Sequence, residues 1–223
     1  MDEPADLLAA LQHGDSFFPS GAVSFSWGLE TLQADGRVVT AGHVAAFVAD
    51  QLRHRWATFD RPALAAAHGA AAHRAAGDLE EVRRIDELVE AQTLAAELRT
   101  GSRRVGGGLL AVHEKLGTAG AAPYRALVRA GEAPGHATVV QGLVWQGAGL
   151  SLAAAEAVSA HGLAVGLLGA ALRLGILGHV EAQRSLQALR GEIAGLLSAQ
   201  ALGPAAMHAF TPAAEIAVMR HET

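Results

Sequence analysis

The stretch from Asp78 to Leu98, DLEEVRRIDELVEAQTLAAEL, has the clearest helical pattern of the sequence. One face carries Val82, Ile85, Leu88, Val89, Gln92, Ala95 and Leu98 at three- and four-residue spacing. Asp78 followed by Glu81 resembles a capping box, the arrangement that satisfies the first free N–H groups of a helix. The spacing therefore predicts one amphipathic helix that continues to about Leu98.

Similar helix signals recur along the chain, whereas runs of alternating β-branched residues are nearly absent. We expect further helices at about residues 4–14, 22–34, 40–56, from 60 onward, 102–116, 123–129, 137–150, 152–175, 179–198 and from 211. The loop at 131–136, GEAPGH, lacks the composition of a long flexible linker. The sequence therefore predicts an all-α fold, a single-domain helical bundle of about ten helices over residues 1–223.

The composition narrows the class of protein. Hydrophobic residues make up 51% of the 223 residues and aromatic residues only 4%, so the core must form by close packing of small side chains. A net charge of −5 offers no general attraction for nucleic acid. The absence of cysteine excludes disulfides and thiolate metal sites. The acidic start MDEPADLL does not resemble a secretory signal, so we expect a cytoplasmic protein.

Motifs for enzymatic chemistry are weak. The one lysine, Lys115, precedes leucine, which excludes a P-loop. GGGLLA from Gly106 matches a dinucleotide fingerprint, but the charged ELRTGSRRV precedes it where a strand is required, so a helix-packing glycine cluster is the better interpretation. The carboxylates Glu80, Glu81, Asp86 and Glu87 are interpreted as solvated charges on the polar helix surface. We therefore predict no enzyme activity and no cofactor.

Metal and membrane sites are also not expected. The eleven histidines lack the spacing of di-iron or zincin motifs. Asp50 and His54, four residues apart, are either a shared metal site or a simple hydrogen-bonded pair, and the pair is the commoner arrangement. The uncharged stretch from Ala133 to Ala155 is interrupted by polar residues, which favours buried core helices over a membrane span.

An unusual cluster lies near the start, at residues 15–30, DSFFPSGAVSFSWGLE. It holds four of the ten aromatic residues. Pro19 fixes φ, Ser20 with Gly21 can begin a helix, and Gly28 permits close backbone contact. The cluster is either a packing corner, where a loop folds into the core, or a docking surface.

FPSGAVSFSWGLE at 18–30 strongly resembles the signature of the UreF family of urease accessory proteins. Three further stretches agree with the family in order and spacing: ELRTGSRRVGGGLL at 97–110, GHATVVQGLVWQGAGLS at 135–151 and LLGAALRLGILGHVEAQRSL at 167–186. The resemblance spans nearly the whole chain. One departure is His179, where the family's Leu-Gly turn usually continues with glutamine.

The resemblance implies an all-helical, non-enzymatic scaffold that assists nickel insertion into apo-urease. It implies a cytoplasmic homodimer that docks the accessory protein UreD or UreH, recruits the UreG GTPase and regulates it, with neither nucleic acid nor membrane as a partner. The alternative is a nickel chaperone that binds Ni²⁺ directly through its histidines. Equilibrium dialysis of the isolated protein with Ni²⁺ separates the two, because only the chaperone binds the metal tightly and stoichiometrically.

Interface hot spots favour aromatic and arginine residues. Such residues occur here near the start of the chain, in its middle and near its end. The candidate partner-binding residues are Phe17, Phe18, Ser24, Ser26, Glu30, Arg103, Arg104, Met219, Arg220 and His221. The C-terminal segment near 211–223 is capped by Thr211-Pro212 but is short for an autonomous helix. We therefore predict that this segment orders mainly against a partner.

Overall fold

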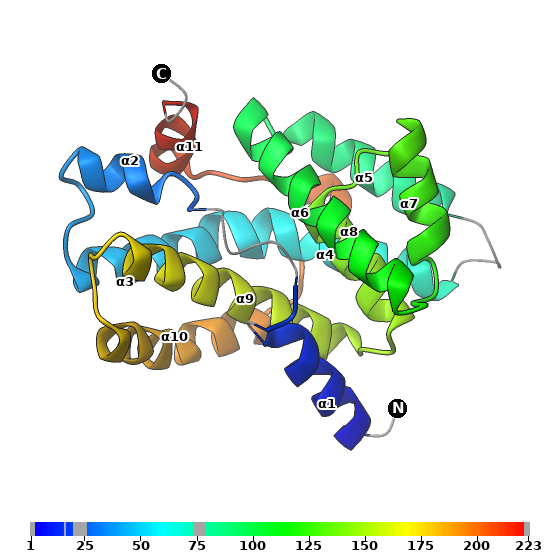
Figure 1. Ribbon diagram of the computed structural model, residues 1–223, viewed down its shortest axis with the longest axis horizontal. Helices are drawn as coiled ribbons and strands as arrows, with labels where there is room; N and C mark the ends of the chain where they lie inside the picture. The colour runs from blue at the N-terminus through cyan, green and yellow to red at the C-terminus, as the bar shows by residue number, and fades with distance from the viewer. Residues whose placement is uncertain (1–2, 16, 20–25, 74–78, 221–223) are drawn as a thin grey trace.

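The computed structural model describes residues 3–15, 17–19, 26–73 and 79–220 (Figure 1). These residues form helices and no strand, which confirms the prediction of an all-α fold of about ten helices. The elements in chain order are α1 (Glu3–Gly14), α2 (Leu29–Ala34), α3 (Ala41–Gln51), the π-helical η2 (Leu52–Asp60), α4 (Arg61–His73), α5 (Glu80–Gln92), α6 (Ala96–Lys115), α7 (Ala121–Ala130), α8 (Ala137–Gly147), α9 (Leu152–Arg173), α10 (His179–Ser198), the 3-10 turn η3 (Pro204–Ala206) and α11 (Pro212–Met219).

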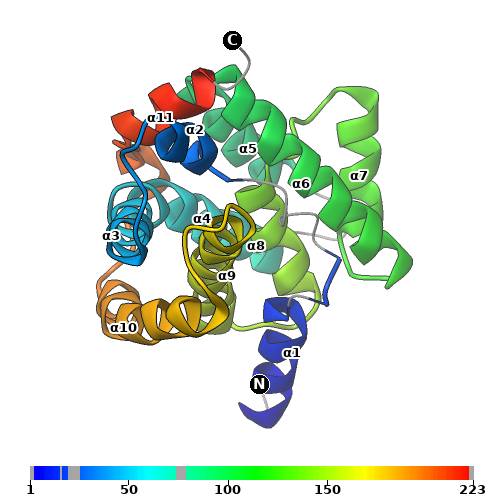
Figure 2. The same cartoon turned by 60° about the vertical axis from the view of Figure 1, so that its left-hand side comes forward.

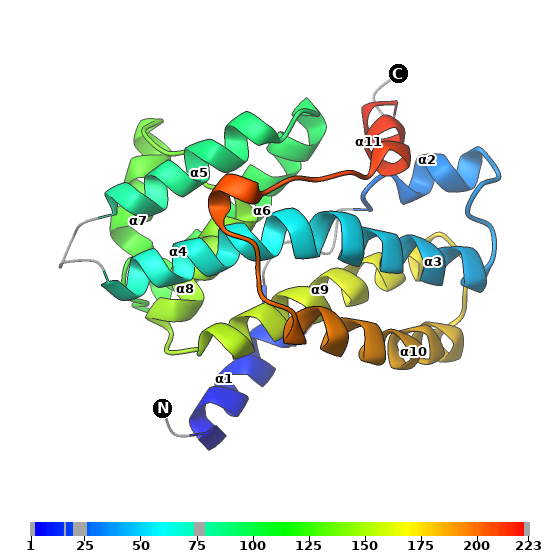
Figure 3. The same ribbon diagram turned by 180° about the vertical axis from the view of Figure 1, so that it is seen from behind.

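A long rod of α3, η2 and α4 crosses the molecule (Figure 3). Thr40 begins it as expected, because its hydroxyl accepts a hydrogen bond from the N–H of His43 at 3.2 Å. Helices α9 and α10 pack against the α3 end, and α5 and α8 pack against the α4 end. The buried hydrophobic residues therefore form two clusters, one where α4 packs with α5 and α8 and one where α3 packs with α9 and α10.

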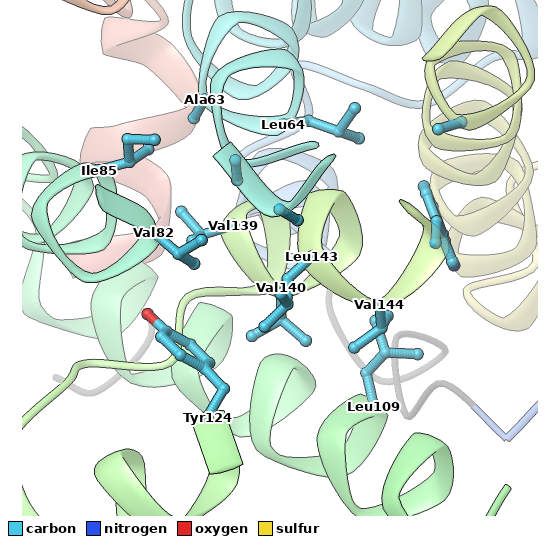
Figure 4. Packing of buried hydrophobic residues seen from close by; sticks show 14 of the residues in the cluster. Ala63, Leu64, Val82, Ile85, Leu109, Tyr124, Val139, Val140, Leu143 and Val144 are labelled. Atoms are coloured by element: carbon cyan, nitrogen blue, oxygen red, sulfur yellow. The ribbon is translucent and has the colours of Figure 1, made fainter. Parts of the chain in front are cut away.

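Helices α4 and α8 approach each other backbone to backbone. A Cβ atom on Gly142 of α8 would lie 2.4 Å from the carbonyl oxygen of Leu64 in α4, so only glycine fits there. Figure 4 shows the side chains that fill the space beside this contact, with Val139 of α8 next to Val82 of α5. Small residues thus bring the two backbones together, as the low aromatic content predicts.

Arg61, the first residue of α4, is buried and joins three helices. One Nη atom donates to the Glu156 carboxylate of α9 at 2.9 Å. The guanidinium also donates to the carbonyls of Leu196 and Ala199 at 2.7 and 3.0 Å, at the C-terminal end of α10. Terminal carbonyls of a helix have no partner within the helix, so Arg61 both neutralises a buried carboxylate and caps α10.

The predicted helix through Leu98 is wrong in its continuity, because the chain breaks between α5 and α6. The Thr93 hydroxyl donates to the Val89 carbonyl, and Arg99 donates to the carbonyls of Thr93 and Leu94 at 2.6 and 2.8 Å. The Thr93 N–H keeps its helical bond to the Val89 carbonyl. The Arg99 side chain satisfies the two carbonyls that follow the end of α5 at Gln92. As a result α6 begins at Ala96 rather than near residue 102.

A second correction concerns the helix expected over 22–34. Residues 20–25 lie outside the described residues, and in the part that is described α2 begins only at Leu29. Trp27 and Gly28 have φ values of 55° and 80°, which a helix cannot contain. The turn is held by close packing, since a Cβ on Gly28 would lie 2.8 Å from the Ala217 Cβ of α11.

One described helix, α9, is long and apolar enough to cross a membrane by length and composition. It packs against α1, α3, α4, α8 and α10, and 44% of its most apolar window is buried inside the molecule. Core helices meet the same criterion, so the helix carries no argument for a span.

The contact between α4 and α8 can be tested with two alanine substitutions. Gly142→Ala forces a methyl group against the Leu64 carbonyl, so we expect a loss of about 1–3 kcal/mol in the free energy of unfolding. Gly69→Ala in α4 meets no described atom within 4 Å, and we expect a gain of up to about 1 kcal/mol from helix propensity. Urea denaturation followed by circular dichroism measures both, and equal effects would contradict the packing.

Candidate docking surface

Three segments from distant parts of the sequence meet at one end of the molecule: the start of α2, the start of α6 and α11 (Figure 2). Val218 of α11 packs with Ala95, which precedes α6, and with Leu98 in the first turn of α6. Trp27 packs against the same cluster. Arg220, just after α11, donates to the Asp35 carboxylate after α2 at 2.6 Å. These hydrogen bonds hold the pKa of Asp35 below its usual value.

Large apolar side chains remain exposed around this junction. Ile216 and Met219 of α11 are 53% and 44% exposed, and Leu94, next to the buried Ala95, is 83% exposed. We refer to Glu30, Leu94, Ile216, Met219 and Arg220 together as the α11 surface. Arg99 hydrogen-bonds the Leu94 carbonyl and thereby fixes the backbone that exposes the Leu94 side chain.

The candidate residues from the two ends of the chain are thus brought together in part. Glu30, Met219 and Arg220 lie on the α11 surface, although they are far apart in sequence. Ser26 is half-buried, and its carbonyl accepts the N–H of Leu29 at the start of α2. Ser24 and His221 lie outside the described residues.

Phe17 and Phe18 lie away from this surface, at the end of α1. Phe17 is 91% exposed. Phe18 is half-buried, with its ring 4.9 Å from that of His13 and 5.5 Å from that of His113. The packing-corner interpretation of the aromatic cluster therefore describes Phe18, whereas Phe17 offers an open contact.

His113 of α6 is fully buried beneath Phe18. Its ring stacks on that of His13 at 5.3 Å, and its Nδ1 hydrogen-bonds the Thr118 hydroxyl at 2.8 Å. Burial, with a smaller contribution from His13, lowers the pKa of His113 to about 4. The α1–α6 contact therefore contains an imidazole that the fold keeps neutral.

Arg103 and Arg104, adjacent on α6, have different environments. Arg103 Nε donates to the Glu90 carboxylate of α5 at 2.9 Å. Glu90 also bonds Nε2 of the buried His136 at 2.7 Å, and the arginine hydrogen bond holds the pKa of Glu90 down. Both arginines are exposed, and Arg103 is held in place by its ion pair with Glu90.

Asp86, which we interpreted as a solvated surface charge, is buried, and that interpretation was wrong. Its carboxylate accepts the Tyr124 hydroxyl at 2.5 Å and the N–H groups of Gly135 and His136 at 2.6 and 2.9 Å. Burial raises the pKa of Asp86, and these three hydrogen bonds oppose the rise. The carboxylate thus joins α5, α7 and the loop before α8.

The helical spacing contained a signal that Asp86 is buried, although it could not identify the partners of Asp86. Asp86 lies three residues before Val89 and four after Val82, on the buried face. By contrast, Glu80, Glu81 and Glu87 are exposed as expected and pair with Arg83 and Arg84. A charge on an apolar face indicates a buried partner, here the free N–H groups of the Gly135-His136 turn.

In the glycine cluster of α6, Gly106 packs closely as predicted, whereas a Cβ on Gly107 would meet no described atom within 4 Å. A Cβ on Gly106 would lie 2.1 Å from the Gly135 carbonyl oxygen, so the turn before α8 rests directly on the α6 backbone. The Ser102 hydroxyl in the same helix accepts the N–H of Ala137, the first residue of α8. Two of the stretches that carry the family resemblance therefore contact each other.

The Asp50 and His54 side chains are 3.7 Å apart and both about half exposed. The described residues contain no group of three or more histidine, aspartate or glutamate side chains arranged to hold a metal ion. In the part of the chain that the structure describes, the geometry therefore favours the simple pair.

Comparison with known proteins gives a consistent result. A family model described as UreF matches residues 38–190. The chain is similar to the urease accessory protein UreF of Trichodesmium erythraeum, with 34% identity over 97% of this chain and 93% of the relative. It is also similar to the UreF proteins of Paenarthrobacter aurescens, 33% identical over 96% and 93% of the two chains, and Cereibacter sphaeroides, 32% identical over 98% and 95%.

The Asp86 network can be tested with a near-isosteric change. Asp86→Asn removes the charge and turns an amide N–H₂ toward groups that are themselves donors, so we expect a loss of about 1–3 kcal/mol in the free energy of unfolding. Glu87→Gln, on the exposed side of the same helix, is the matched control and should change it by less than about 0.5 kcal/mol. Equal effects of the two variants would disprove the network's role.

His113 predicts a dependence of stability on pH. The folded protein keeps His113 neutral down to pH about 4, so between about 6.5 and 4 the unfolded chain binds more protons. The free energy of unfolding should therefore fall as the pH falls through this window, with His113 contributing at most about 3 kcal/mol. Urea titrations from pH 7 to 4 should show a shallower fall for His113→Gln, whereas the exposed His73→Gln should match the parent protein.

Proposed function

This chain belongs to the UreF family of urease accessory proteins, and from that membership we propose that it serves urease maturation as a docking protein. In this proposal it assists nickel insertion into apo-urease without catalysing a reaction of its own. It acts in the cytoplasm as a homodimer, binds UreD or UreH, and recruits and regulates the GTPase UreG. The partner GTPase supplies the nucleotide chemistry, and this chain positions it.

The observation that carries the proposal is the α11 surface. Its exposed side chains are of the type that anchors interfaces: large apolar residues beside an arginine whose orientation is already set. Leu94, Ile216 and Met219 leave apolar area in contact with water, and a partner would remove that area from water. Because α2, the residues before α6 and α11 meet here, one partner surface can contact all three segments.

Helix α11 is short, and its buried residues are Ala214, Ala217 and Val218. A helix of eight residues is not stable by itself in water, so contacts outside the helix decide whether it orders. This supports the prediction that the segment near 211–223 gains order from a partner.

We expect Ile216→Glu and Met219→Glu to weaken binding of UreD or UreH about tenfold or more, because each places a carboxylate in an apolar interface. Leu8→Glu on α1, where Leu8 is 67% exposed, is the matched control and should bind like the parent protein. Interferometry with immobilised UreD or UreH gives the affinities, and circular dichroism verifies folding.

The opposite pattern, with Leu8→Glu weakened and both α11 variants unchanged, would locate the interface on α1 and refute the proposal. Hydrogen exchange of residues 211–223 provides an independent readout. We expect stronger amide protection in the complex than in the free chain, and equal protection would contradict the partner-dependent ordering of this segment.

A further inference from the structure

A cleft of about 230 Å³ lies between η2, α6, α8 and α9. It is lined mainly by apolar side chains, among them Trp56, Leu109, Val158 and Leu163. It is separate from the α11 surface, apart from its border at Trp27 and Leu98. This volume is enough for several water molecules or for one small organic molecule.

Arg55 of η2 lies at one end of this cleft and is only 5% exposed. Its guanidinium carbon is 5.0 Å from the ring centre of Trp27 and 4.8 Å from that of Phe59, so two aromatic rings hold it in place. Its Nε donates to Asp60 at 3.3 Å. Within the described part of the chain its two Nη atoms have no hydrogen-bond partner, which leaves several donors of a buried cation available.

Two residues at the other end of the cleft each carry a polar atom without a partner in the described chain, but both atoms are fully buried and do not face the cleft. Trp145 is almost fully buried and lines the cleft, and its Nε1–H has no partner among the described residues. His13 Nδ1 hydrogen-bonds the Ala9 carbonyl and must therefore carry the proton, so its unpartnered Nε2 is an acceptor. Thr138 and Trp145 lie seven residues apart on α8, so the cleft extends about 10 Å along that helix.

The lining of the cleft determines which kind of ligand it can bind. The unused donors that can meet a ligand are the two Nη atoms of Arg55, because the unpartnered atoms of Trp145 and His13 are fully buried. Two carboxylates, Asp15 and Asp60, also line the cleft, and Asp60 is already bonded by Arg55 Nε. A ligand that fits must therefore accept hydrogen bonds, carry negative charge toward Arg55 and present an apolar body to the remaining walls. We propose that this cleft binds a small monocarboxylate with a compact apolar body, its carboxylate on Arg55. The inference does not rest on the proposed function.

The side of the cleft at α9 provides a way to fill it. Gly162 and Gly166 line the cleft, and a Cβ on either meets no described atom within 4 Å. The pair therefore supports no close helix contact in the described chain. A leucine at 166 would extend from an unobstructed backbone position beside the ligand space, and it would also favour the helix.

The experiment is titration calorimetry on the full chain at neutral pH with four probes. Benzoate combines a carboxylate and an apolar ring, benzyl alcohol has the ring alone, and acetate and inorganic phosphate have the charge alone. We expect benzoate to bind one to one with a Kd below about 1 mM and at least tenfold more tightly than the other three. Equal binding of benzoate and benzyl alcohol, or of benzoate and acetate, would overturn the proposal.

Variants locate the binding. Gly166→Leu should abolish benzoate binding, whereas Gly191→Leu, at an open position of α10 away from the cleft, should retain it. Arg55→Gln should reduce benzoate to the affinity of benzyl alcohol, and if Arg55→Gln does not fold, the comparison of Gly166→Leu with Gly191→Leu is sufficient by itself. Benzoate binding that survives Gly166→Leu would mean that benzoate binds outside the cleft. No binding by any probe would mean that the cleft holds only water. Either result would refute the proposal.

Discussion

Backbone-to-backbone contact at glycine is the constraint on which the rest of this structure depends. The core has few bulky side chains, so its helices must approach closely to exclude water. Gly142 brings α8 against α4, Gly106 brings α6 against the turn before α8, and Gly28 brings the start of α2 against α11. A side chain at any of these positions would meet backbone or Cβ atoms of another segment within 3 Å.

These contacts set the positions of the functional surfaces. The Gly28 contact holds the start of α2 against α11 and so assembles the α11 surface from segments that are far apart in sequence. The Gly106 contact presents the Gly135-His136 turn to Asp86, where its N–H groups are bonded. The polar networks therefore depend on the close contacts between backbones. A carboxylate is stable in the core only where such contacts hold hydrogen-bond donors in position.

Two arginines on one continuous rod show how the same side chain has two roles. Arg61 is paired with Glu156 and with the end of α10, so removing it would leave a buried carboxylate and free carbonyls. Arg55, six residues earlier, is held between two rings and retains unused donors toward a cleft. The first stabilises the fold, and the second is the basis of the proposed ligand site.

The sequence alone determined the all-α class, most helix positions, the helix-packing role of Gly106 and the family, because helix periodicity, capping and motif order are local properties. Only the tertiary structure decided the break at Thr93–Ala95, the partners of Asp86 and the separation of Phe18 from the α11 surface. Each depends on a partner distant in sequence or on side-chain hydrogen bonds at a helix end. Local spacing cannot specify such partners, since they meet only when the helices pack.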